Sequence, residues 1–249
     1  AERGELPELV TLDAIRGDLH CHTTWSDGRD TARAMAEAAR ERGYAYLAIT
    51  DHSRHSRVAN GLDPHRLAQQ IDEIDRLADE LDGIRLLKGS EVDILEDGAL
   101  DLPDDVLARL DLRVCSLHDK LDLPQAKQTE RVIRAMDNRW FNILAHPTGR
   151  LIDKRAPAAL DMERVLEGAR ERGCFLEINA QPERLDLTDT HARMAKEMGV
   201  KLAISTDAHS TSGLAAVRFG IDQARRGWLA PDDVLTTKPW DEIALLFDR

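Results

Sequence analysis

Histidine and carboxylate side chains recur where the predicted strands of this sequence end. His20 and His22 close the first strand, and Asp27 follows on a Ser-Asp-Gly turn. Because side chains alternate along a strand, the two histidines point to the same side, and a pair at this spacing can bind one metal ion. Later strand ends carry the same residue types, at His52, Glu91, His118, His146, Asp207 and His209. We interpret this recurrence as a metal centre.

The donor types indicate which metals such a centre would hold. Neutral imidazole and carboxylate suit zinc, iron or manganese, and the sequence has no paired cysteines for a structural zinc knuckle. The nine candidate ligands exceed the roughly four to six that one ion takes, so two or three divalent ions are expected. Such ions would attract phosphate, and a water shared by two of them can attack phosphorus. The residues therefore predict metal-dependent phosphoester hydrolysis.

Arginines close to the candidate ligands could bind a phosphate group. Guanidinium forks match phosphate geometry, although arginine is abundant here and a solvated surface role stays open for each. The candidates for substrate binding are Arg54, Arg57, Arg150 and Arg184. The remaining histidines fall in loop or helix positions, where we expect solvated or capping roles: His55, His65 and His191.

The elements that must position these residues alternate along the chain. Apolar runs of strand length lie at 46–50, 84–87, 112–117, 141–145, 175–178 and 201–205, and a further strand ends at Leu19. Amphipathic helical runs lie at 31–42, 64–81, 125–136, 162–172 and 188–198. Repeated helix-Gly-strand joins indicate βα units, and about seven of them in this length favour a closed or nearly closed α/β barrel over an open doubly wound sheet. In a barrel all strand ends open onto one face.

Length and composition agree with one globular α/β domain. The chain has 249 residues, 42% hydrophobic and 32% charged, with three cysteines that we expect to be reduced. It has no apolar run of membrane-spanning length and no signal-peptide order at its start, so we expect a cytoplasmic protein with no membrane partner. Residues 1–15 read as a lead-in, residues 16–249 as the domain, and residues 239–247 as a closing amphipathic helix. The net charge of -12 repels polyanions.

Six stretches of the chain resemble the motifs of the PHP (polymerase and histidinol phosphatase) domain family. They are HCHTTWSDG, TDHS, the Glu of GSEVD, the His of CSLHD, AHPTGR and STDAH, in that order. The resemblance implies a distorted (β/α)7 barrel, TIM-like and in a single domain, with a trinuclear metal site and phosphoesterase activity. It also implies catalytic roles for His20, His22, Glu91, Asp207 and His209.

The resemblance also assigns the ligands to three centres. One would use His20, His22, Glu91 and Asp207; Glu91 would bridge to a second held by His118 and His146; and the third would use Asp27, His52 and His209. All nine positions carry the expected residue types. One departure is Asp119, which follows His118 where a small polar residue is expected, and which either adds a carboxylate beside the second metal or points outward.

Longer stretches are similar to one branch of the family. RGDLHCHTTWSDG, TDHSRHSRVANGL, KQTERVIRAM, HPTGRL and EINAQPERLDL look like the C-terminal PHP domain of bacterial family X DNA polymerases, and GELPEL looks like the linker before it. This implies manganese-dependent 3′-5′ exonuclease activity on DNA 3′ ends, with a polymerase domain in the full-length parent. The acidic charge predicts weak DNA binding by the isolated domain.

Three other functions stay open. A free-standing phosphomonoesterase of the histidinol-phosphate type would use the same ligands. A non-catalytic, metal-stabilised module of a polymerase is a second alternative, although no ligand position is lost. An amidohydrolase-type barrel is a third, and it fits Asp27 and His209 badly.

Overall fold

Seven parallel strands form the centre of the molecule. The computed structural model describes residues 7–248, and its strands pair in chain order. They are β1 (Gly17–Asp18), β2 (Tyr46–Ile49), β3 (Arg85–Asp93), β4 (Leu112–Ser116), β5 (Ile143–Leu144), β6 (Phe175–Asn179) and β7 (Leu202–Ser205). Beyond the ends of β1 and β7, the His22 N–H donates to the Ala208 carbonyl at 2.8 Å, so the barrel is nearly closed. The predicted distorted barrel is confirmed, and the open sheet is wrong.

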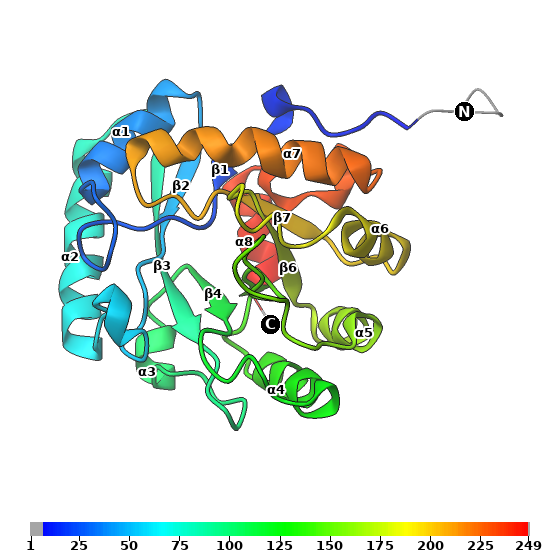
Figure 1. The fold of residues 1–249 in the computed structure, drawn as a ribbon. Coiled ribbons are helices and arrows are strands. Elements are labelled where there is room, and N and C mark those ends of the chain that lie inside the picture. The colour runs from blue at the N-terminus through cyan, green and yellow to red at the C-terminus, as the bar shows by residue number, and fades with distance from the viewer. Residues whose placement is uncertain (1–6, 249) are drawn as a thin grey trace.

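Helices surround the strands, as Figure 1 shows. They are α1 (Ala32–Glu41), α2 (Pro64–Glu80), α3 (Asp104–Leu107), α4 (Gln125–Met136), α5 (Met162–Arg172), α6 (Asp189–Glu197), α7 (Val217–Arg226) and α8 (Trp240–Phe247). Side-chain oxygens cap several N-termini: those of Thr31, Asp63, Asp161 and Thr188 accept from the N–H three residues ahead. These caps fix where α1, α2, α5 and α6 begin.

Two differences from the predicted elements have physical causes. Helix α7 was not predicted because Gly220 weakens its helical pattern, yet a Cβ there would lie 2.7 Å from Ile204 Cγ2, so glycine is needed for the helix to pack on β7. Strand β3 runs beyond Leu87 through polar residues. Glu91 therefore lies inside a strand and not at its end.

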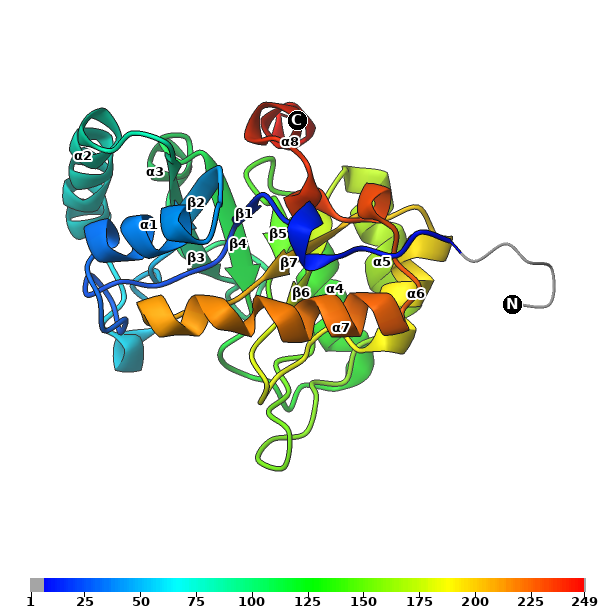
Figure 2. The ribbon, with the colours of Figure 1, turned by 90° about the horizontal axis from the view of Figure 1, so that it is seen from above.

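The two ends of the barrel differ in their contents. A buried apolar cluster fills the interior toward one end and includes Tyr46, Leu87 and Phe175 from the strands. Helix α8 closes that end with Trp240 and Phe247, and Figure 2 shows it set apart from the outer helices. The predicted closing helix is thus present. The opposite end, where the strands terminate, carries the polar residues.

The segment before β1 packs against the barrel where the structure describes it. Val10 is buried, and its N–H donates to the Leu229 carbonyl at 3.0 Å. Residues 1–6 of the predicted lead-in lie outside the described residues, and the domain boundary at residue 15 stays a prediction. The three cysteines are buried thiols. Within residues 7–248, no helix combines the length and apolar character needed to cross a bilayer.

Candidate metal centre

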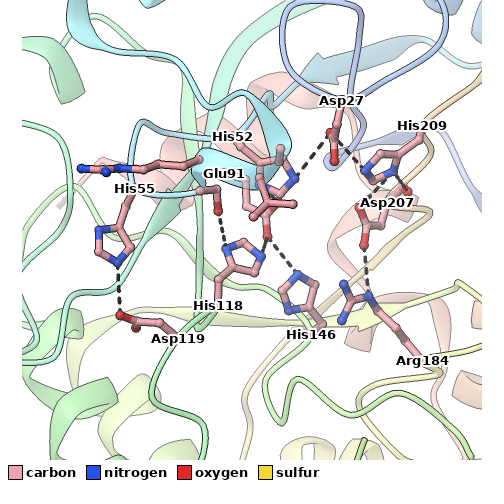
Figure 3. Close-up of a pocket in the computed structure, with 14 residues that line it drawn as sticks. Asp27, His52, His55, Glu91, His118, Asp119, His146, Arg184, Asp207 and His209 are labelled. Atoms are coloured by element: carbon pink, nitrogen blue, oxygen red, sulfur yellow. Dashed lines mark hydrogen bonds and ion pairs between the residues drawn. The ribbon is translucent and has the colours of Figure 1, made fainter. Parts of the chain in front are cut away.

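The nine predicted ligands meet at the end of the barrel opposite α8. Seven of them line a pocket of about 450 Å³, and Figure 3 shows Glu91 near its middle with His118 and His146 pointing toward it. His20 and His22 lie beneath, fully buried, in contact with Glu91 and Asp207. Side chains from residues 20 to 209 are thus brought together, as the strand-end pattern predicts.

The first cluster joins both early histidines to two carboxylates. His20 Nε2 and His22 Nε2 lie 3.2 Å apart. Glu91 Oε2 is 3.3 Å and 3.5 Å from these atoms, and Asp207 Oδ1 is 3.7 Å and 3.1 Å from them. Four donors bound tetrahedrally at about 2.1 Å lie roughly 3.4 Å from one another. The spacing therefore fits one cation among these four atoms.

The second cluster uses the other oxygen of Glu91. Oε1 lies 2.9 Å from His146 Nε2 and 3.2 Å from His118 Nε2. Because the two oxygens of Glu91 face different sets of imidazoles, this carboxylate is placed to bridge two cations.

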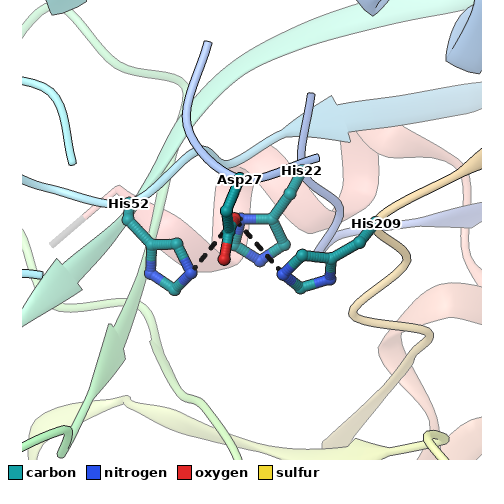
Figure 4. A group of neighbouring side chains, drawn as sticks. All are labelled: His22, Asp27, His52 and His209. Carbon is teal, nitrogen blue, oxygen red and sulfur yellow. Dashed lines mark ion pairs between the residues drawn. The ribbon is translucent and has the colours of Figure 1, made fainter. Parts of the chain in front are cut away.

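The third cluster is built around Asp27 (Figure 4). Its Oδ1 lies 3.6 Å from His52 Nε2 and 3.3 Å from His209 Nε2. His22 Nδ1 approaches the same oxygen at 3.9 Å, and His52 Nδ1 lies 2.9 Å from Glu91 Oε2. His22 and His52 therefore each lie between two clusters, a sharing that the family resemblance did not imply.

Two buried carboxylates orient the imidazoles and were missed at the sequence level. Glu177 Oε1 lies 2.8 Å from His20 Nδ1, and Asp93 Oδ1 lies 2.8 Å from His118 Nδ1. Each partner leaves the Nε2 atom facing the pocket, which is how ligating histidines are usually held. The signal was present in the sequence, because Glu177 interrupts an apolar strand and becomes fully buried there.

Further buried carboxylates hold the loops that carry the ligands. Asp51 accepts from the Thr23 N–H at 2.9 Å and the Thr23 hydroxyl at 2.7 Å, which fixes the turn leading to Asp27. Asp18 accepts from the Thr206 hydroxyl at 2.6 Å, one residue before Asp207. Burial raises the pKa of Asp18 to about 6. These residues position ligands without facing the pocket.

The backbone is strained at two ligands. His146 has φ 24° and Asp207 has φ 51°, in the left-handed region that side chains other than glycine rarely adopt. Such positions cost on the order of 1–3 kcal/mol each and concentrate at functional sites. Here the strain lies at two donors that different strands contribute.

The pKa values show that carboxylate charge dominates the metal-free site. Burial opposes it, but the hydrogen bond from His209 and the charge of His52 lower the pKa of Asp27 to about 2. Against the effect of burial, Glu91 and Asp93 raise the pKa of His118 to about 10, and Asp27 and Asp207 raise that of His209 to about 9. Burial, followed by the charge of His52, lowers the pKa of His22 to about 3. In the metal-free site, protonated imidazoles such as His118 and His209 therefore balance the carboxylates, and bound cations would replace those protons.

Of the four predicted arginines, two line the pocket. Arg184 Nε lies 3.4 Å from Asp207 Oδ2, and Arg57 lies on the rim. Arg54 instead donates to Asp101 at 3.3 Å. Arg150 donates to the carbonyl of Arg184 at 2.7 Å, so it supports the loop that carries Arg184.

The rim also contains two residues whose roles were open. His55, for which a solvated role was expected, lines the pocket with its Nε2 3.1 Å from Asp119 Oδ2. Asp119 also accepts from Arg131 Nη2 at 2.6 Å, so it joins the rim to α4. His65 is exposed, and His191 is partly buried at the start of α6.

The residues present fit a multinuclear metal site. Imidazole nitrogens and carboxylate oxygens are spaced as ligands of single cations, and His22 Nδ1, which faces Asp27 at 3.9 Å, is buried without a hydrogen-bond partner. Buried polar atoms are normally paired. Metal clusters of this kind at the strand ends of a TIM-like barrel are an arrangement that metal-dependent hydrolases use.

The profile of the PHP domain family matches residues 18–181. The chain therefore belongs to the PHP domain family, and with it to the metal-dependent phosphoesterases. The resemblance seen in the sequence motifs is confirmed.

Relatives of two kinds are similar to the chain. It is 46% identical over 97% of its length to "DNA polymerase/3'-5' exonuclease PolX" of Bacillus subtilis, of which it spans 42%. It is 31% identical over 88% of its length to a "Probable phosphatase" of Thermoanaerobacter sp. strain X514, covering 89% of that protein. The solved histidinol phosphate phosphatase of Lactococcus lactis, in complex with zinc, L-histidinol and phosphate, shares the fold with a TM-score of 0.59 at 15% identity, covering 84% of this chain and 93% of that one.

Proposed function

We propose that this chain is the 3′-5′ exonuclease domain of a family X DNA polymerase and hydrolyses phosphodiester bonds at DNA 3′ ends. The observation that carries the proposal is the set of ligand-type side chains around one pocket, in a chain 46% identical over nearly its whole length to a protein named for this activity. The cytoplasm is the location that goes with such a parent protein.

Two or three divalent ions, of manganese, zinc or iron, would be the cofactors. His20, His22, Glu91 and Asp207 would hold one, Glu91 with His118 and His146 a second, and Asp27, His52 and His209 a third. When bound, such ions supply Lewis acidity and an activated water for attack on phosphorus.

The chain's own residues bind and orient the substrate. Arg184, 18% exposed and 3.4 Å from Asp207, offers its remaining N–H groups to a phosphate held above the cluster. Glu177 and Asp93 keep His20 and His118 in one orientation, so the donors do not have to reorganise on binding. His20 and His22 form the floor of the site and are fully buried, so solvent does not compete for their ring nitrogens from below.

Binding of DNA by the isolated chain should be weak. Neutralising a DNA backbone takes many Lys and Arg contacts, and this chain carries 34 basic against 46 acidic residues. A tethered polymerase domain would raise the local concentration of DNA ends. The proposed partners are therefore DNA 3′ ends and the polymerase part of the parent chain.

The test is a primer-degradation assay with the purified chain and manganese. A 5′-labelled single strand should shorten stepwise from its 3′ end, and the Asp207→Asn variant, purified in parallel, should leave it intact and so exclude a contaminating nuclease. An intact primer beside rapid hydrolysis of p-nitrophenyl phosphate would contradict the proposal. Equal activity of both proteins on every substrate would favour the non-catalytic module.

A phosphomonoesterase acting on a small metabolite is the second candidate. It is favoured by the phosphatase-named relative, which the chain covers over 89% of its length, and by the acidic net charge. The two candidates separate by kcat/KM: the exonuclease prefers a dinucleotide to any monoester, and the phosphomonoesterase shows the reverse.

A further inference from the structure

One loop lines the rim of the pocket but supplies no predicted metal ligand. This rim loop, residues 54–61, contains the 3-10 turn Arg57–Ala59, and residues 55–59 line the pocket. Three of its residues at the rim are exposed: His55, Arg57 and Val58. The pocket of about 450 Å³ falls within the range of nucleotide-sized ligand sites and exceeds what one phosphate group requires.

The first half of the rim loop is fixed by buried groups. The His55 N–H donates to Asp101 at 2.7 Å, and the His55 ring lies 3.1 Å from Asp119. Asp119 is itself held by Arg131, whose side chain is 1% exposed. The Ser56 hydroxyl donates to Asp93 at 3.0 Å. An exposed histidine held at both ring and backbone has lost freedom that surface side chains normally keep.

The second half is fixed as well. The Gly61 N–H donates to the Ser56 carbonyl at 3.1 Å, and the Leu62 N–H to the His52 carbonyl at 2.7 Å. Arg66 of α2 donates to the Asn60 carbonyl at 2.8 Å. The loop is therefore a preorganised structure, and it shares Ser56 and Asp93 with the His118 side of the metal cluster.

The apex of this rigid loop bears the groups without partners. No carboxylate among residues 7–248 forms an ion pair with the Arg57 guanidinium. The Val58 side chain is fully exposed, with a relative exposure of 106%. Arg184, by contrast, is ion-paired to the ligand Asp207. The pocket thus has one arginine beside the cluster and another, unpaired, on its rim.

We propose that the rim loop binds the nucleotide on the 5′ side of the scissile bond, with Arg57 binding the 5′ phosphate of that nucleotide and Val58 contacting its sugar or base. This inference rests on the proposed exonuclease function. A rigid loop that presents an unpaired cation and an apolar side chain matches one phosphate and one nucleoside face, and its fixed geometry lowers the entropy cost of binding. His55, with Asp119 and Arg131, acts as a positioning residue that fixes the loop. Binding energy from this non-reacting phosphate would favour DNA over small monoesters.

The test compares two dinucleotides that differ by one phosphate. TpT has only the scissile phosphate, whereas pTpT carries a second on its 5′ nucleotide, which a 3′-5′ exonuclease leaves with a free 3′ hydroxyl when it releases the 3′-terminal nucleotide. The wild-type chain should cleave pTpT with a kcat/KM at least about tenfold higher, mainly through KM, which is the effect expected of one phosphate-arginine contact. Arg57→Ala should bring this ratio close to one. Arg184→Ala should lower kcat/KM for both dinucleotides by the same factor, so their ratio is kept. Arg76 is an exposed arginine on α2, and Arg76→Ala should leave both kcat/KM values at the wild-type level.

The positioning role of His55 has its own readout. His55→Ala should reduce the pTpT/TpT ratio through KM while the metal content per chain stays constant, and His55→Gln, which can still hydrogen-bond Asp119, should recover part of it. The inference is overturned if the wild type shows no preference for pTpT, or if Arg57→Ala lowers kcat/KM for both dinucleotides by the same factor. Failure to cleave either dinucleotide, with monoesters hydrolysed, would instead reject the exonuclease proposal, and the inference with it.

Discussion

The two ends of the barrel are made from the same strands but from opposite kinds of residue. At one end Trp240 and Phe247 of α8 pack on an apolar interior. At the other, imidazoles and carboxylates are buried with strained backbone at His146 and Asp207. Apolar burial stabilises the fold, whereas buried charge costs free energy unless it is paired. The comparison indicates that the apolar end contributes most to the stability of the fold, whereas the polar end carries the residues for metal binding and catalysis.

The largest effect should follow from removing one charge at the polar end. Asp207→Asn takes a carboxylate from the first cluster, so kcat/KM for any phosphoester should fall at least about 10³-fold and bound metal should decrease. The free energy of unfolding of the metal-free chain should fall less than after a core substitution, because Asn loses the ion pairs to His20 and Arg184 but also removes a buried charge. Activity assays, elemental analysis and urea unfolding measure the three quantities.

The matched control for this change is Asp222→Asn, an exposed carboxylate on α7 that should leave all three quantities unaltered. If Asp207→Asn unfolded the chain as strongly as a core substitution, the separation between the two ends would be wrong.

The apolar end should behave in the opposite way. Trp240, 6% exposed, packs with Tyr46 at a ring distance of 6.2 Å. Trp240→Ala should lower the free energy of unfolding by about 3–5 kcal/mol through lost burial and a new cavity. Metal content and kcat of the remaining folded protein should stay at wild-type values. Urea unfolding and elemental analysis on the same sample provide the check.

Leu245→Ala is the control on the same helix, because Leu245 is 77% exposed. Its effect should stay within about 0.5 kcal/mol. A loss of bound metal in folded Trp240→Ala would show that the ends are coupled.

A third change tests how far the polar end extends beyond the ligands. Glu177 lies one layer below the cluster and orients His20. Glu177→Gln should weaken metal affinity about 10–100-fold, the usual effect of losing such a partner, with unfolding little changed. Glu167→Gln, an exposed glutamate on α5, is the control. Unchanged metal affinity, measured by competition with a chelating dye, would restrict the site to its direct ligands.

The sequence predicted the barrel and the convergence of its ligands because both follow from local patterns. Strand and helix periods show where the chain turns, and parallel strands place every strand end on one face. The sharing of His22 and His52 between clusters could not be predicted, since it depends on side-chain directions in a distorted barrel. The different contacts of Arg54 and Arg57 could not be predicted either. The two residues are close in sequence, yet Arg54 donates to Asp101 and Arg57 lines the pocket.

The expected effect of pH on stability should appear only at the polar end. The folded-state pKa values of His118 and His209, about 10 and about 9, exceed the ordinary value of 6.5. Groups with raised pKa values contribute stability that is fully present below pH 6.5 and is lost as pH rises through 9 to 10. The Tm of the EDTA-treated chain should therefore fall over this range, by roughly 2–4 °C for each 1 kcal/mol lost. The effect of Asp18, whose pKa is about 6, lies at lower pH.

Manganese should remove this dependence, because cations replace the protons that balance the carboxylates. His209→Gln should reduce it in the metal-free chain, whereas His65→Gln, at an exposed position on α2, should not. Scanning calorimetry at pH 6.5 and pH 9.5, each with and without metal, distinguishes these cases. Trp240→Ala should lower every Tm and keep the same pH dependence, since burial raises the pKa of Tyr46, the titratable side chain of the apolar cluster, beyond this range. A different dependence of Tm on pH in Trp240→Ala would mean that packing at the apolar end alters the protonation of the polar end.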